Sequence, residues 1–181
     1  MIRQAHGRAC PRQKARIAIR GAGCQPLPGC ANIEDVITID LSRLLGTELD
    51  KERNIIHVGA GGRWGVVYNK LHPEGLACTG ARSSLNGVGV LPLSGGLSFF
   101  GTREGFVCYN VVNYEVVLAS SKVVNSNQNE NSDLFVALRG GGNNLGIVTR
   151  LDLRTFKQGP FSGTAPSSTS HRASPARSRH W

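Results

Sequence analysis

The stretch S-D-L-F-V-A-L-R-G-G-G-N-N-L-G-I-V-T, residues 132–149, decides how this chain is expected to fold. Ser132 and Asp133 are typical of a helix N-cap, and residues 134–138 supply one or two amphipathic turns. Three glycines then end the helix before a β-branched run begins at Ile147. The bare backbone predicts either a tight helix-to-strand turn or a surface against which a flat or phosphorylated ligand lies.

Two further glycine-rich segments are attached to expected strands. Residues 15–19, A-R-I-A-I, alternate as a strand and lead into R-G-A-G-C at 20–24. Residues 79–100 contain Gly87, Gly89, Gly95 and Gly96. A glycine inside a strand costs roughly 0.5 to 1 kcal/mol relative to alanine, so a compensating interaction is expected. A ligand that needs backbone N–H groups is one compensation, and close packing of two backbones is the other.

The remaining periodicity predicts a mixed α and β region. Residues 36–41 and 54–58 alternate as strands, with a charged turn at 48–53 between them and a glycine loop at 59–62. Residues 63–71 have helical spacing, with Trp64 expected in the core and Gly75 after the helix. Residues 111–119 and 122–125 are expected to form a hairpin that turns at Ser120 and Ser121.

The net charge of +9 is concentrated at the two ends of the 181-residue chain. Six of the 21 basic residues fall in residues 1–20 and three in residues 162–181, and the other 12 balance the 12 acidic residues. A nucleic-acid binder carries its basic side chains on the folded face that meets phosphate, so this distribution argues against nucleic acid as a partner. The alternative interpretation, a basic protein that binds polyanions, is supported only by the arginines at the two ends of the chain.

The sequence offers no metal site, membrane span or catalytic residue. Its five cysteines have irregular spacing without a CxxC pair, which leaves either buried free thiols or one disulfide. Nothing is long and apolar enough to span a membrane, and no signal-peptide pattern is visible, so the localisation stays open. His57 in a strand and His72 after a helix are expected to be structural or solvated.

Several consecutive motifs resemble one family. They are I-R-G-A-G-C, I-T-I-D-L-S-R-L, V-G-A-G-G-R-W-G-V-V-Y-N-K-L, G-V-G-V-L-P-L-S-G-G-L-S-F-F, N-V-V-N-Y-E-V-V-L-A and D-L-F-V-A-L-R-G-G-G-N-N-L-G-I-V-T. In this order they resemble the FAD-binding domain of the p-cresol methylhydroxylase (PCMH) and vanillyl-alcohol oxidase type, in the fungal branch with berberine-bridge-type relatives. The resemblance covers residues 15–161. It implies an α+β flavin domain of two small subdomains, with FAD between them.

The resemblance also implies the cofactor-binding residues. Two loops would cradle the diphosphate, and the start of the last strand would present backbone to FAD. The residues implied are Arg20, Gly21, Ala22, Gly23 and Cys24 in the first loop, Ser83, Gly87, Gly89, Gly95, Gly96 and Ser98 in the second, and Gly146, Ile147 and Val148 in the strand. Backbone N–H groups hold a diphosphate without a basic patch, which agrees with the neutral central region.

Some positions depart from the family pattern. Many relatives have a histidine that tethers the flavin where this chain has Cys24, and doubly anchored relatives have a cysteine at the position of Ser83. FAD is therefore expected to be non-covalent, with a Cys24 thioether as the alternative. Ala22 and Val90 replace glycines, and Tyr109 stands where an acidic residue is common. These changes are expected to weaken FAD binding.

The resemblance sets the expected domain boundaries. Residues 1–14 are expected to be an irregular basic N-terminus, residues 15–161 a partial FAD-binding PCMH-type domain, and residues 162–181 a disordered basic tail. The first subdomain is expected to be truncated and the substrate domain absent. The implied function is the FAD-binding portion of an oxidoreductase that oxidises an alcohol, sugar or alkaloid-like molecule with O2 as acceptor. The alternative is a non-catalytic remnant that binds FAD weakly or not at all.

Overall fold

A computed structural model describes residues 17–25, 31, 34 and 37–159. Its strands are β1 (Ile17–Arg20), β2 (Ile37–Asp40), β3 (Thr47–Asp50), β4 (Ile55–Gly59), β5 (Leu76–Ala77), β6 (Val111–Val117), β7 (Val123–Ser126), β8 (Ile147–Arg154) and β9 (Phe156–Lys157). Its helices are α1 (Trp64–Leu71), α2 (Gly101–Glu104) and α3 (Ser132–Leu138), with the short 3-10 helices η2 (His72–Glu74), η3 (Leu91–Ser94) and η4 (Val107–Asn110). The α+β class is confirmed.

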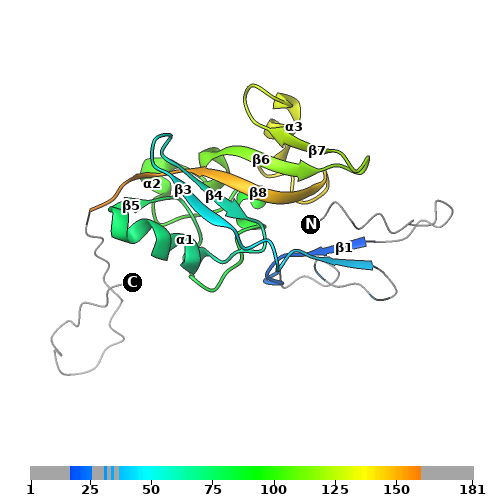
Figure 1. Cartoon of the computed structure of the whole chain (residues 1–181), viewed down its shortest axis with the longest axis horizontal. Helices are drawn as coiled ribbons and strands as arrows, with labels where there is room; N and C mark the ends of the chain where they lie inside the picture. Colours follow the sequence, from blue (N-terminus) through cyan, green and yellow to red (C-terminus); the bar gives the residue numbers. More distant parts are fainter. Residues whose placement is uncertain (1–16, 26–30, 32–33, 35–36, 160–181) are drawn as a thin grey trace.

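A five-stranded antiparallel sheet in the order β3-β4-β8-β6-β7 forms the centre of the molecule (Figure 1). β8 lies in the middle because its residues on one face are apolar and completely buried, as Leu151 and Leu153 are. Leu151 pairs with Val58 on β4 and with Tyr114 on β6, which makes one continuous apolar layer.

Helix α1 contributes its apolar face to the same core. Trp64, Val67 and Leu71 recur at helical spacing and are buried, as the sequence predicts. Burying each such side chain contributes about 1.5 to 3 kcal/mol. Gly75 follows η2 in the left-handed conformation, with a φ of 65°, and turns the chain into β5.

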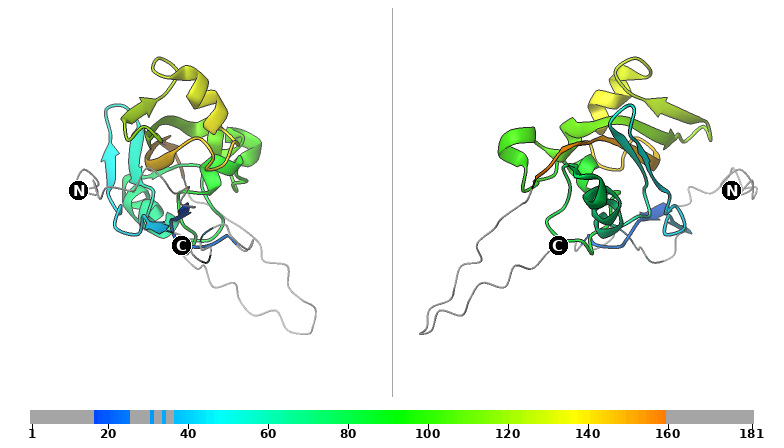
Figure 2. Two further views of the ribbon diagram at one scale, coloured as in Figure 1. Left: turned by 90° about the vertical axis from the view of Figure 1, so that its right-hand side faces the viewer. Right: turned by 60° about the vertical axis from the view of Figure 1, so that its left-hand side comes forward.

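Strands β1 and β2 form a separate, parallel pair in which Ile19 lies beside Ile39. Both isoleucines pack against the core cluster, and buried Leu41 belongs to it. Both views in Figure 2 show the pair, at the blue end of the chain, below the five-stranded sheet. The described residues therefore form three sheets, since β5 and β9 make a second two-stranded pair.

The sequence that was expected to decide the fold forms α3, a glycine turn and β8. The predicted N-cap is wrong, because Asn131 occupies that position in the left-handed conformation, with a φ of 49°, and no side chain caps the helix. The Asn131 side chain instead donates a hydrogen bond to the Asn125 carbonyl at 2.7 Å. Asparagine tolerates this backbone region, which explains the shift of the cap by one residue.

The hairpin is confirmed, with Ser121 in its turn at a φ of 64°. The charged turn predicted for residues 48–53 is wrong in its first half, because residues 47–50 form the edge strand β3, which pairs with β4. The expectations for residues 1–14 and 162–181, and for the first two residues of the first strand, fall outside the described residues. No helix in the described part of the chain is long and apolar enough to cross a membrane.

Candidate functional site

The loop after β1 begins at a charged pair. Arg20 Nη2 donates to Asp40 Oδ2 at 2.6 Å, and the two residues are register partners on β1 and β2. The hydrogen bond from Arg20, with further ones from Ser42, lowers the pKa of Asp40 to about 2. Asp40 is therefore ionised at neutral pH and fixes the start of the loop.

A cavity of about 550 Å³, here called the smaller cavity, lies beside this loop. It is lined by four of the predicted cofactor residues and by residues from the β2 end and the start of α1, namely Arg20, Gly21, Ala22, Gly23, Asp40, Ser42, Leu45, Gly61, Arg63 and Val66. The first N–H groups of α1 do not face this cavity as free donors. Trp64 donates to the Asn86 carbonyl at 3.0 Å and Gly65 to the Ser84 carbonyl at 2.9 Å.

Three predicted glycines lie where the two loops meet. A Cβ on Gly87 would come within 2.5 Å of the Ala22 Cβ. Cβ atoms on Gly21 and Gly89 would lie 3.5 Å and 3.1 Å from the same carbonyl oxygen of Ala60. The first and second glycine loops, about sixty residues apart in the sequence, therefore pack directly against each other.

A second cavity of about 1000 Å³, here called the larger cavity, lies beside the second glycine loop. Ser83, Gly95 and Gly96 line it together with Ala81, Arg82, Asn86, Leu91, Ser94, Leu97, Phe99, Phe106, Cys108, Tyr109 and Arg139. Gly95 and Gly96 have φ values of 84° and 81°, which only glycine adopts without strain. Sites for small molecules have this size and this mixture of apolar and polar walls.

The other predicted residues lie outside both cavities. Ser98 Oγ accepts hydrogen bonds from the N–H groups of Gly80 and Phe100, both at 3.3 Å. Gly146 packs on β6, where an added Cβ would lie 2.7 Å from a Val116 methyl. Ile147 and Val148 pair with Val117 and Val116 in the sheet. Cys24 is exposed, with its Sγ 3.7 Å from the carbonyl oxygen of Ala22.

Sequence reasoning named Arg20 but missed three other arginines of the site. Arg63 lines the smaller cavity and donates to the Leu85 carbonyl, and Arg82 and Arg139 line the larger cavity. Their only sequence signal is position, since Arg139 directly precedes the glycine triplet and Arg63 directly precedes α1. The described residues contain no group of three His, Cys, Asp or Glu that could hold a metal ion.

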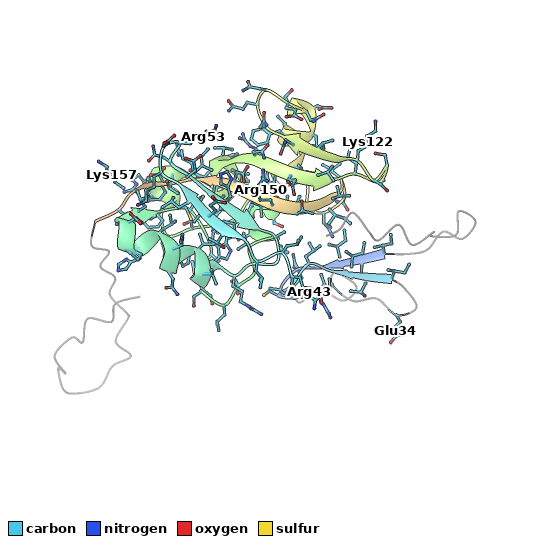
Figure 3. All side chains as sticks on the ribbon, in the orientation of Figure 1. Glu34, Arg43, Arg53, Lys122, Arg150 and Lys157 are labelled. Atoms are coloured by element: carbon cyan, nitrogen blue, oxygen red, sulfur yellow. The ribbon has the colours of Figure 1, made fainter. Side chains whose placement is uncertain are left out.

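His57 lies away from both cavities. Its Nδ1 is 2.7 Å from Asp152 Oδ1, in a polar cluster on strands β4, β8 and β6. Arg150 belongs to this cluster and projects over the middle of the sheet (Figure 3).

Comparison with known proteins decides the family. Residues 4–127 match the family model of the FAD-binding domain. The chain belongs to this family. Over 146 residues it is 47% identical to the FAD-dependent monooxygenase tpcD of Cochliobolus heterostrophus, in a match that covers 81% of this chain and 28% of tpcD. The chain thus spans about a third or less of the length of the curated relatives that it matches.

Solved structures show the same relationship. The 6-hydroxy-D-nicotine oxidase of Arthrobacter nicotinovorans has a TM-score of 0.76 and 26% identity, over 79% of this chain and 31% of that one. Glucooligosaccharide oxidase of Acremonium strictum, described with a 6-S-cysteinyl, 8α-N1-histidyl FAD, has a TM-score of 0.71 and 29% identity, over 79% of this chain and 30% of that one. A variant of BBE-like 1 from Physcomitrella patens has a TM-score of 0.69 and 27% identity, over 78% and 31%. The resemblance to PCMH-type flavoproteins with berberine-bridge-type relatives is confirmed.

Proposed function

We propose that this FAD-binding domain holds FAD non-covalently for an oxidoreductase that oxidises an alcohol, sugar or alkaloid-like small molecule, with O2 as acceptor. Residues 15–161 would form the FAD-binding domain. The substrate would bind to the full-length parent protein. The observation that carries the proposal is the direct packing of the two glycine loops, at Gly87 and Ala22, with the first loop lining the smaller cavity and the second loop lining the larger one. The names of the relatives support the substrate classes, since they include a 6-hydroxy-D-nicotine oxidase and a glucooligosaccharide oxidase.

The residues present fit FAD. The larger cavity has room for a dinucleotide, and Gly95 and Gly96 add no side chains of their own to its wall. The guanidinium of Arg139 lines the same cavity and supplies N–H donors and a positive charge for a phosphorylated ligand. FAD would supply the redox chemistry when bound, and this chain would bind and orient it. The predicted residues that line the cavities would make these contacts.

The proposed non-covalent attachment rests on two side chains. Glucooligosaccharide oxidase is described with both a cysteinyl and a histidyl bond to FAD. At the corresponding positions of the family pattern, this chain has a hydroxyl, from Ser83, and a thiol, from Cys24. Ser83 cannot form a thioether, and Cys24 is free and exposed beside the carbonyl of its own loop. The first loop therefore contains no histidine that could form a covalent bond to the flavin.

One observation favours the second candidate, a remnant that binds little FAD. The Ala22 methyl group occupies the space between the two loops, where the family pattern has a glycine. Compared with glycine, this methyl group places one additional carbon atom between the two backbones. If it blocks the cofactor, the chain keeps the fold of the family without its cofactor.

The test is the visible absorption spectrum of the purified protein, expressed with added FAD, before and after acid precipitation. A flavin band that leaves with the supernatant supports non-covalent binding. A band retained in the pellet of the unchanged protein, and absent from that of Cys24→Ser, would show a Cys24 tether and overturn the non-covalent proposal. A colourless, folded protein would support the remnant, and Ala22→Gly should then recover the band.

A further inference from the structure

Arg139 is held in the wall of the larger cavity by contacts that use few of its donors. Its guanidinium carbon lies 4.1 Å from the centroid of the Phe135 ring, in a cation–π contact. Its Nη2 donates to the Val111 carbonyl at 3.5 Å, which is a long hydrogen bond. The Nε atom is buried and has no partner in the described residues. A guanidinium has five N–H donors, and the three on Nη1 and Nη2 that make no hydrogen bond within the described residues can meet a ligand of the cavity.

The charge of Arg139 is not balanced by this chain. Arg139 makes no ion pair with any described residue, whereas Arg20, Arg150 and Arg154 all pair with carboxylates. The residues that line the larger cavity include Arg139 and Arg82 but no aspartate or glutamate. The half-buried guanidinium of Arg139 shares this lining with apolar side chains such as Leu91 and Phe106, where a nearby anion would stabilise it. A ligand of this cavity is therefore expected to bring negative charge.

Backbone donors of the same cavity point to the kind of anion. The carbonyls of Gly95 and Gly96 accept hydrogen bonds from Cys108 and Val107, at 2.9 Å and 3.0 Å. Neither glycine's N–H group donates to a backbone carbonyl of the described residues. Two such donors and a guanidinium on one cavity suit an anion with several oxygen atoms, such as a diphosphate.

We propose that Arg139 pairs with the diphosphate of FAD in the larger cavity, as a side-chain cation added to a cradle of backbone N–H groups. The inference rests on the proposed function, because it requires that FAD is the ligand. It goes beyond the sequence expectation of a diphosphate held by backbone alone. Arg139 then discriminates between flavins with and without a diphosphate.

The test compares FAD with riboflavin, which has the same ring system but no phosphate. Flavin fluorescence is titrated against the unchanged protein, Arg139→Met, Arg139→Lys and the control Arg53→Met, whose exposed side chain lies outside both cavities. We expect Arg139→Met to raise the Kd for FAD roughly tenfold to a hundredfold, the usual effect of losing a charged hydrogen bond. The Kd for riboflavin should be unchanged, and lysine should recover part of the loss.

Other outcomes would overturn the proposal. An equal rise in Kd for FAD and for riboflavin would mean that Arg139 supports the packing of the site or contacts the flavin ring system, and does not pair with the diphosphate. If the unchanged protein binds neither flavin, the proposed function itself fails. If it binds both with the same Kd, FAD is a ligand but the diphosphate is not recognised.

A second measurement covers the case in which Arg139→Met does not fold, since Arg139 packs on Phe135. The Kd of the unchanged protein for FAD and for ADP is then followed with increasing NaCl. Screening should weaken both in parallel if a cation meets the diphosphate. A Kd for FAD that does not change with salt would contradict the pairing.

Discussion

At the scale of single residues, the site depends on contacts that leave no room for a methyl group. The sequence predicts that Ala22 places a methyl where backbone must approach closely, and in the structure that methyl meets Gly87. An alanine at position 87 would set two Cβ atoms 2.5 Å apart, which is well inside van der Waals contact. The two positions are therefore expected to be energetically coupled.

Gly87→Ala should lower the free energy of unfolding by about 1 to 3 kcal/mol, because the added methyl overpacks the junction of the two loops. In an Ala22→Gly background the same change should cost much less, since the opposing Cβ is gone. Urea denaturation of the four proteins in this cycle measures the coupling. An equal cost of Gly87→Ala in both backgrounds would show that the two residues do not meet.

The cysteines differ in exposure, which predicts their reactivity. Burial raises the pKa of Cys78 to about 12, and burial also raises the pKa of Cys108. Cys24 is exposed. In a Cys10→Ser, Cys30→Ser background, one thiol per folded chain should react with Ellman's reagent at about pH 8, and three should react in urea. Fast reaction of a second thiol in the folded chain would contradict the burial of Cys78 and Cys108.

At the scale of elements, Asp152 ties three strands of the sheet together. Its carboxylate on β8 accepts hydrogen bonds from Arg150 Nε at 2.9 Å and from Asn113 on β6 at 2.9 Å, and lies 2.7 Å from His57 on β4. Burial opposes its ionisation, but the hydrogen bonds from Arg150, His57 and Asn113 outweigh burial and lower its pKa below 3.8. The ionised carboxylate is the form that stabilises the sheet.

The sign of the resulting pH dependence follows from this lowered pKa. A carboxyl group with a lower pKa in the folded state stabilises the protein above its unfolded pKa, and that stability is lost as the pH falls through the folded value. The urea midpoint should therefore fall as the pH is lowered from about 5 toward 3. Asp152→Asn should cost about 2 to 3 kcal/mol at neutral pH and flatten this decline. Glu130→Gln, at an exposed position, is the control and should leave the decline in place. A decline as steep in Asp152→Asn as in the unchanged protein would rule out this role.

Gly95 and Gly96 form a matched pair in the loop after η3. Both have a positive φ, but an added Cβ meets no atom within 4 Å at Gly95 and meets Leu91 and Val107 at 2.9 Å at Gly96. Gly95→Ala should cost about 1 to 2 kcal/mol from backbone strain alone. Gly96→Ala should cost about 1 to 3 kcal/mol more, through overpacking. Thermal denaturation compares the two, and a smaller loss for Gly96→Ala would contradict the packing described here.

Elements with a strong local period were predictable, and the rest were not. α1, the hairpin and the α3–β8 unit follow from the spacing of their apolar residues. β3 escaped prediction because T-E-L-D carries few strand-forming side chains, and its pairing with β4 is what makes it a strand. The glycine loops were visible in the sequence. Two features of the site depend on the tertiary fold and cannot be predicted from a local sequence pattern. They are the contact of Gly87 with Ala22 and the position of Arg139 in the larger cavity.

At the scale of the whole molecule, the smaller cavity adjoins the two-stranded β1–β2 sheet. The β1–β2 pair has two strands, whereas the central sheet has five, and two paired strands alone are marginally stable. The β1–β2 pair is connected to the rest of the domain by two sets of contacts. Ile19, Ile39 and Leu41 pack in the core, and Ala22 contacts Gly87 in the loops. A ligand that contacts both glycine loops from the cavities would add a further connection. Local stability is therefore expected to rise unevenly when FAD binds.

Hydrogen–deuterium exchange with and without FAD measures this difference. The N–H groups of residues 17–23 and 87–90 should exchange more slowly with saturating FAD, because local opening of β1–β2 would require release of the ligand. Those of β8, whose residues pair on both sides in the sheet, should change less. The control is riboflavin, which lacks the diphosphate and should protect the two loops less than FAD does. Equal protection of β8 and the loops would mean that FAD stabilises the domain globally, and that the β1–β2 layer does not open by itself.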